Sequence, residues 1–296
     1  MAATTPDRVS APRQSGLSYR NRLLLKRTAI YAVLILWALI FLLPLFWMLS
    51  TSLKPKSQWF SRDIAWIPRT ITMENYERIL NNSQTPIGRW FVNSLIVGTI
   101  TTALVLLIDA MAAYAYARME FRGRKVIFAL LLATLFLPGM MFLVPNFITV
   151  ARLGLLNSFA GVIIPGLAGV FGVFFLRQFF TTIPKELEEA AQIDGASQLM
   201  TFFRVVLPLA KSAMVTLGIL TFLGSWNEFL WALLILKDRN IQTLPPGLRT
   251  LQGAYTSEYG QMMAGAVIAA VPVLLLYLVM QKYIVQSVAT SGLAGQ

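Results

Sequence analysis

Trp226, Asn227 and Glu228 follow one another inside an apolar run, and together they have the composition of a sugar site. An indole offers a flat apolar face to a sugar ring, while an amide and a carboxylate can hydrogen-bond to its hydroxyl groups. The same polar side chains could instead bond across helices or pin a subunit interface, as polar groups in membrane spans often do. Both readings stay open, and we assign the three residues to a candidate substrate pathway.

A second carboxylate, Asp109, also falls inside an apolar run. A charged side chain in a membrane costs at least ~2.5 kcal/mol on insertion scales, so such groups usually face a cavity or a partner. Asp109 lies nearer the basic end of its run than Glu228 does, and we expect it to have a structural role. The two carboxylates are expected at different depths, which disfavours an intramembrane enzyme that would use them as a pair.

The segment 181–211 is polar, although apolar runs flank it on both sides. Pro184 suits the first turn of a helix because its missing N–H would have been unpaired there. The acidic residues Glu186, Glu188 and Glu189 then lie near the positive end of the helix dipole. One face of this helix is small in the middle, and it carries Leu187, Ala190, Ala191 and Asp194.

Gly195 can adopt the left-handed conformation that ends a helix. Ser197 could cap the next helix, and Pro208 interrupts the chain before another apolar run. A helix pair with small residues on one face, held between two spans, indicates a surface that docks in a recess of another protein. The alternative is a helix pair that is merely amphipathic at the membrane surface.

The composition is that of a membrane protein, since 56% of the 296 residues are apolar and only 13% are charged. The chain has no histidine and no cysteine, which excludes thiolate and histidine metal sites, disulfides and cysteine nucleophiles. The net charge of +12 could suggest nucleic acid, but the basic residues are scattered among apolar runs. Their position favours membrane edges and no nucleic-acid partner.

Six apolar runs predict an all-α polytopic protein in a lipid bilayer. Domain boundaries follow from these runs: 1–27 is a disordered tail with a basic anchor, 28–285 is the transmembrane domain, and 286–296 is a second tail. The first run is too long for the core of a cleaved signal peptide and is expected to be retained. The predicted spans are 28–49, 90–116, 126–150, 158–176, 212–236 and 262–281.

An even number of spans places both termini on one side. With the termini in the cytoplasm, the inner segments carry 15 lysines and arginines and the outer loops carry 10. This bias favours cytoplasmic termini and a cytoplasmic position for segment 181–211.

The spacing Glu189-Ala-Ala191, Gly195 and Val205-Val-Leu-Pro208 resembles the EAA loop of inner-membrane permease subunits of binding-protein-dependent ABC importers. Val205 stands where isoleucine is commoner. Other segments resemble the carbohydrate-importing branch, and in particular its six-span permease of the maltose type. They are 174–180, 226–231, 243–248 and 281–285, and the last eleven residues depart from that branch's usual tail.

The resemblance implies that this loop is a coupling helix seated in a groove of a cytoplasmic ATPase. The implied contact residues are Glu189, Ala190, Ala191, Asp194, Gly195 and Ala196. It further implies a second permease subunit, two ABC ATPase subunits and an extracytoplasmic sugar-binding protein, in the cytoplasmic membrane of a bacterium or archaeon. Transport would proceed by alternating access.

No Gly-x-x-x-x-Gly-Lys-Ser/Thr loop occurs, so we do not expect this chain to be an enzyme that hydrolyses ATP. We expect no cofactor in it, with ATP and Mg²⁺ bound by the partner ATPases. No lysine or arginine falls within a span, which favours a neutral sugar over glycerol phosphate, the alternative solute for the same importer type. An ion-driven carrier with carboxylate proton sites is the remaining alternative, and it leaves the EAA spacing unexplained.

Overall fold

A computed structural model describes residues 19–59, 65–251 and 258–293, and the side chains of 19–22 and 282–293 lie outside the description. The predicted tail over residues 1–18 therefore lies outside the described residues. In the described ranges the chain is all-helical, as predicted. The chain divides into two compact units, Met1–Met48 and Leu49–Gln296, and each is considered by itself.

The first unit contains most of α1, a single helix over Tyr19–Ser52. The helix begins before the basic residues Lys26 and Arg27, so the predicted basic anchor is its first part. Between residues 23 and 46 every side chain is exposed. A helix that is apolar on all sides suits a membrane span, and α1 is long and apolar enough to be one.

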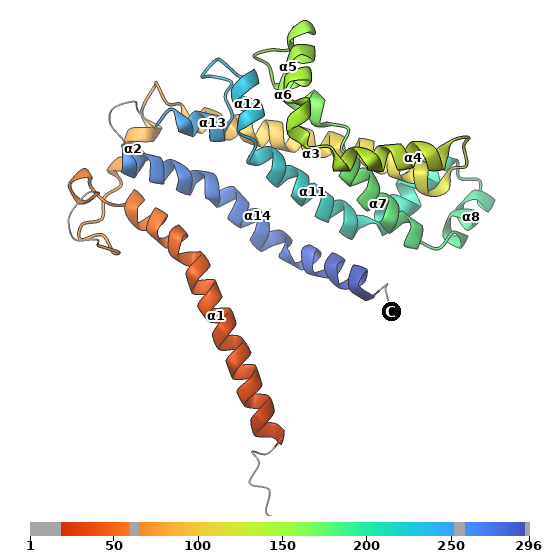
Figure 1. Cartoon of the computed structure of the whole chain (residues 1–296), viewed down its shortest axis with the longest axis horizontal. Coiled ribbons are helices and arrows are strands. Elements are labelled where there is room, and N and C mark those ends of the chain that lie inside the picture. The colour runs from red at the N-terminus through yellow and green to blue at the C-terminus, as the bar shows by residue number, and fades with distance from the viewer. Residues whose placement is uncertain (1–18, 60–64, 252–257, 294–296) are drawn as a thin grey trace, which may run out of the picture. The chain divides into compact units, whose positions relative to one another are not determined.

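The second unit is a bundle in which α3 (Ile87–Arg118) packs against α7 (Val170–Thr182) and α11 (Lys211–Trp226). α11 also packs against α14 (Tyr259–Leu293), as Figure 1 shows. The remaining α-helices of this unit are α2 (Glu74–Leu80), α4 (Arg124–Ala133), α5 (Leu143–Arg152), α6 (Phe159–Ile163), α8 (Glu186–Ile193), α9 (Gln198–Thr201), α10 (Leu207–Leu209), α12 (Leu230–Ile235) and α13 (Leu244–Arg249).

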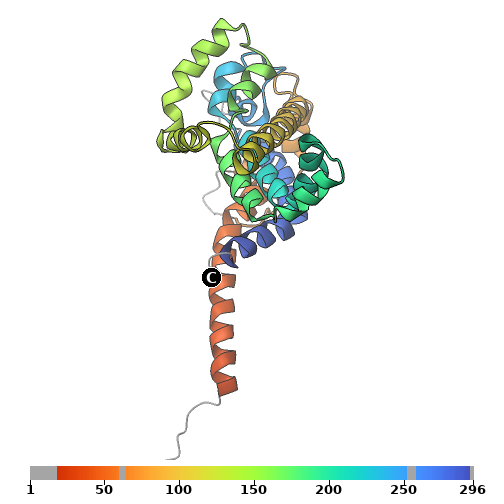
Figure 2. The same cartoon turned by 90° about the vertical axis from the view of Figure 1, so that its right-hand side faces the viewer.

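Among the described residues, three helices are long and apolar enough to cross a membrane, and the number rises to six if each of three bent helix pairs counts as one span. The pair 124–136 and 139–152 bends by 98° (Figure 2), the pair 159–166 and 170–182 by 48°, and the pair 198–209 and 211–226 by 80°. The predicted third and fourth spans, 126–150 and 158–176, are each broken by such a bend, whereas the 80° bend falls before the predicted fifth span, 212–236.

The physical reason for the bends lies in the residues at the breaks. Pro138 is extended at the first break, and a proline cannot donate the N–H that would continue the preceding helix. Gly169 is extended at the second break, where it precedes α7. The fifth predicted span also stops early, because α11 ends at Trp226 and the chain turns before α12. The last helix is longer than predicted and continues to Leu293.

The two ends of α3 are held by different partners. At its beginning, the Trp90 indole donates to the Arg239 carbonyl at 2.6 Å, and the Asn93 amide donates to the Gln242 carbonyl at 2.8 Å. Gly247 of α13 lies so close to Trp90 that a Cβ there would be 2.3 Å from the ring. α3 therefore begins beside α13 and ends beside α8, which places the polar segment 181–211 at the far end of the bundle (Figure 1).

Candidate functional site

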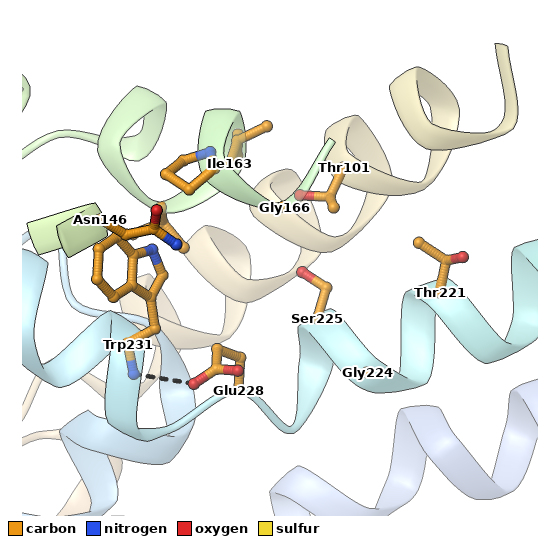
Figure 3. Close-up of a pocket in the computed structure, with 11 residues that line it drawn as sticks. Thr101, Asn146, Ile163, Gly166, Thr221, Gly224, Ser225, Glu228 and Trp231 are labelled. Carbon is orange, nitrogen blue, oxygen red and sulfur yellow. Dashed lines mark hydrogen bonds between the residues drawn. The ribbon is translucent and has the colours of Figure 1, made fainter. Parts of the chain in front are cut away.

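A pocket of about 340 Å³ lies between α3, α6 and α11, and Thr101 places it about halfway along α3. Figure 3 shows the side chains of Thr221 and Ser225 on one face of α11, turned toward the same space as Glu228 and Trp231. The lining residues are Thr101, Asn146, Val162, Ile163, Pro165, Gly166, Thr221, Gly224, Ser225, Glu228 and Trp231.

Glu228 lies in the non-helical turn between α11 and α12, which leaves its carboxylate free to bend back. Its Oε1 accepts a hydrogen bond from the backbone N–H of Trp231 at 2.9 Å, so the carboxylate caps the first turn of α12 (Figure 3). The Trp231 indole N–H donates to the Gly161 carbonyl at 3.2 Å. These two bonds fix the aromatic wall of the pocket against α6.

The pocket combines an indole, one carboxylate, three hydroxyl groups and the amide of Asn146. Among the residues that line it, Glu228 is the one ionisable group. Such a wall can stack a sugar ring and accept or donate hydrogen bonds to its hydroxyls, and it offers no cation to an anionic solute.

Of the three residues predicted for the substrate pathway, Glu228 lines the pocket and the other two do not. Trp226 is 1% exposed, stacks on Phe222 and donates from its indole to the Ala269 carbonyl at 3.2 Å. Asn227 is exposed and its amide donates to the Leu223 carbonyl of its own helix at 2.9 Å. In this conformation Trp226 packs in the core and Asn227 ends α11.

Sequence reasoning missed most of the pocket. Trp231 belongs to segment 226–231 but was not predicted for the substrate pathway. Ser225 directly precedes the three predicted residues. Their proximity to Glu228 in the chain was the available signal. Thr101 and Asn146 come from distant elements, and nothing in the local sequence marks them as partners of Glu228.

Segment 181–211 forms the short helices that the sequence predicted. α8 begins at Glu186, two residues after Pro184. Gly195 has φ +84° and ends the helix in the left-handed conformation. The Ser197 hydroxyl accepts from the Met200 N–H at 3.3 Å and caps α9. The chain then forms a π-helical turn over Phe202–Val206 before α10.

A buried ion pair anchors this segment to the end of α3. The Glu188 Oε1 atom lies 2.5 Å from Arg118 Nε, and both side chains are less than a tenth exposed. The Tyr114 hydroxyl donates to the other carboxylate oxygen at 3.1 Å, and Arg118 also donates to the Ile183 carbonyl at 2.5 Å. Sequence reasoning placed Glu188 at the helix dipole and missed this anchor.

The opposite face of the segment is accessible. Ile193 is 87% exposed, Leu199 is 63% exposed and Leu187 is 45% exposed, an unusual display of apolar side chains for a polar segment. The six residues predicted to contact an ATPase lie on or beside this face. Glu189, Ala190, Asp194 and Gly195 are exposed, and Ala191 and Ala196 are half-buried.

Asp109 lies in neither region. It is 1% exposed on α3, and its carboxylate faces the first turn of α7.

Comparison with known proteins identifies the family of the chain. Residues 106–290 match the family described as binding-protein-dependent transport system inner membrane component. The arabinooligosaccharides transport system permease protein AraQ of Bacillus subtilis (strain 168) is 34% identical, and the match covers 91% of this chain and 96% of that protein. The diacetylchitobiose uptake system permease protein NgcG of Streptomyces coelicolor is 38% identical, over 88% of this chain and 86% of that protein.

A further relative is archaeal: the trehalose/maltose transport system permease protein MalG of Thermococcus litoralis is 32% identical, over 92% of this chain and 98% of that protein. Among solved structures, a bacterial ABC transporter involved in the import of the acidic polysaccharide alginate contains a chain that superposes with a TM-score of 0.78 at 26% identity. That match covers 91% of this chain and 99% of the other. The chain therefore belongs to the family of binding-protein-dependent transport system inner membrane components, the permease subunits of ABC importers.

Proposed function

We propose that the chain is one permease half of an ABC importer that carries an uncharged mono- or oligosaccharide across the cytoplasmic membrane by alternating access. The observation that carries the substrate class is the pocket at Glu228, where an indole, a carboxylate and hydroxyl groups surround a space of about 340 Å³. The relatives named for arabinooligosaccharides, diacetylchitobiose and trehalose or maltose support a sugar.

The proposed pocket favours a neutral solute over an anionic one. Glu228 would repel a carboxylate or phosphate, and no cation lines the space to offset that repulsion. The solved bacterial transporter that takes part in alginate import has a similar fold, although alginate is an acidic polysaccharide. Charge in the pocket, and not the fold, is therefore the feature on which we base the choice.

In this proposal, partner subunits that bind ATP supply the energy for transport. The exposed face of α8 and α9 docks on an ABC ATPase subunit, and two such subunits bind ATP and Mg²⁺ while this chain has no ATPase site of its own. A second permease completes the translocation path, and an extracytoplasmic sugar-binding protein delivers the solute. Both termini face the cytoplasm, which puts segment 181–211 on the side where ATP is available.

The test is purification of the tagged chain from its native membrane in mild detergent, followed by mass spectrometry of what remains bound. We expect a second permease and an ATPase with a phosphate-binding loop, and ATP-dependent uptake of a labelled neutral oligosaccharide by proteoliposomes that contain this complex.

Glu189→Lys reverses the charge of an exposed residue on the docking face and should release the ATPase while the chain still inserts in the membrane. Glu77→Lys serves as the control, because it reverses the charge of another exposed residue outside segment 181–211. Recovery of the chain alone, or uptake that follows an ion gradient without ATP, would contradict the proposal.

A further inference from the structure

Asp109 is a buried carboxylate that neither the pocket nor the anchor uses. It is 1% exposed, and within the described part of the chain neither carboxylate oxygen has a hydrogen-bond partner. Burying an unpaired charge is costly, and such a group in a membrane protein usually has a partner in some state of the molecule.

The carboxylate is aimed at the first turn of α7. A Cβ atom on Gly172 would lie 2.0 Å from Asp109 Oδ2, and one on Gly169 would lie 3.4 Å from the same atom. The absence of side chains at these two glycines lets the carboxylate rest directly against the helix backbone. Leu217 of α11 closes the other side, since it also lies within contact distance of Gly172.

The first turn of α7 offers the hydrogen bonds that Asp109 lacks. The first amide groups of a helix have no intrahelical acceptor, and they form the positive end of the helix dipole. Gly169 is the N-cap of α7, and this helix start has no side-chain cap hydrogen bond in the described part of the chain. A buried acceptor without donors and a helix start without an acceptor therefore lie side by side.

This contact is placed at an elbow between the two functional regions. The pair 159–166 and 170–182 bends by 48°, and Asp109 faces the first turn after the bend. The arm before the bend carries the pocket residues Val162, Ile163, Pro165 and Gly166. The arm after it is α7, which leads within four residues to α8. A change in the angle of this elbow would move pocket and docking face relative to each other.

We propose that Asp109 is a positioning residue that latches this elbow: in the alternate state of the transport cycle its carboxylate accepts hydrogen bonds from the free amide groups that begin α7. The inference rests on the proposed function, because it assigns the elbow a part in alternating access. The latch favours the state in which the carboxylate is satisfied, so the latched state is the one that ATP binding or release must overcome.

The experiment uses the purified importer complex in proteoliposomes. The chain has no cysteine, so Ile164→Cys and Thr181→Cys introduce one pair of spin labels on the two arms without other changes. Both positions are exposed, and neither lines the pocket. The distance between the labels is measured without nucleotide and with ATP and vanadate, beside the amount of sugar transported per ATP hydrolysed.

In the wild-type background we expect two distance populations whose ratio depends on nucleotide. Asp109→Asn keeps the shape but removes the charge, and it should shift that ratio on the order of tenfold, the size expected for a charge-assisted hydrogen bond. Sugar transported per ATP should fall with it. Asp238→Asn makes the same chemical change on an exposed loop and should alter neither quantity.

Gly172→Ala gives a second route to the same result, since its Cβ displaces the carboxylate without changing any charge. Gly88→Ala, in the same bundle but with open space around its Cβ, is the control. The latch is overturned if Asp109→Asn and Gly172→Ala both show the wild-type distances between the labels and the wild-type amount of sugar transported per ATP hydrolysed. If the unaltered complex shows no ATP-dependent uptake, it is the proposed function that fails.

Discussion

The pocket and segment 181–211, for which we propose the docking role and which we call the docking segment, are built in opposite ways. The docking segment is local: a helix start, a left-handed glycine and a serine cap follow one another within residues 184–197. The pocket is assembled from side chains between Thr101 and Trp231, contributed by separate elements. The docking segment can therefore be recognised in a short stretch of sequence, whereas the pocket forms only after the bundle has folded.

Each region also ties a carboxylate to its scaffold, but to different degrees. Glu188 uses both carboxylate oxygens inside the protein, on Arg118 and on Tyr114. Glu228 uses one oxygen to cap α12 and lines the pocket. Both oxygens of Glu188 contact groups of its own chain and so tie segment 181–211 to α3. Glu228 keeps one oxygen beyond its cap, and this is the oxygen that we propose for the solute.

The largest expected effect comes from breaking the buried anchor. Glu188→Ala leaves Arg118 charged in a buried site, which costs about 3–5 kcal/mol. Thermal unfolding of the purified complex should show this loss, and the ATPase should no longer be retained. The pair Glu188→Met with Arg118→Met removes both charges and should recover much of the stability.

The exposed pair Glu74 and Arg78 provides the control for the anchor. Both side chains are nearly half exposed, so Glu74→Ala should cost no more than about 1 kcal/mol. If Glu188→Ala proved as mild as Glu74→Ala, the ion pair would not be what holds the segment.

The next prediction distinguishes a loss of docking from backbone strain at a left-handed glycine. Gly195→Asp should abolish transport while leaving the protein inserted, because it adds bulk and charge to the docking face. Gly154→Asp is the matched control: Gly154 also has a positive φ, +69°, and open space around its Cβ, but it lies outside segment 181–211. Both changes place aspartate in the left-handed conformation at a cost of roughly 1–2 kcal/mol. Uptake should survive in the Gly154 variant only, and equal loss in both would contradict the docking role.

A smaller effect is expected at the pocket. Glu228→Gln keeps an oxygen that can accept the Trp231 N–H but removes the charge, so the KM for a neutral sugar should rise about tenfold with little change in Tm. Glu228→Ala also loses the cap and should lower stability by a further ~1 kcal/mol. Uptake kinetics and thermal unfolding of both variants test these two effects. If Glu228→Gln has the wild-type KM, the carboxylate of Glu228 caps α12 and does not bind the solute.

The smallest effect is expected at Asn227, next to Glu228 in sequence but outside the pocket. Because its exposed amide bonds to its own helix, Asn227→Ala should change stability by no more than about 0.5 kcal/mol. The KM should change by no more than about twofold. A large rise in KM would mean that Asn227 reaches the solute in another conformation, and it would return Asn227 to the substrate pathway beside Glu228.

Much of the fold was predictable because the membrane imposes it. Apolar runs of the right length gave the order of the helices, and the EAA spacing gave the family. The bends were not predicted, because the hydropathy of residues 124–152 is continuous across Pro138 and a run of apolar residues does not reveal a change of direction. Asp109 was noticed as a carboxylate in a span, but its neighbours Gly169 and Gly172 are about sixty residues away in the chain.

What the sequence by itself determined is what depends on neighbouring residues: the membrane character, the capped helix pair at 184–201 and the left-handed Gly195. Tertiary structure alone decided which carboxylates meet a partner. Glu188 and Glu189 are adjacent and chemically identical, yet one is buried against Arg118 and the other is exposed. Burial and charge pairing depend on elements distant in the chain, and their effect is fixed only when those elements pack.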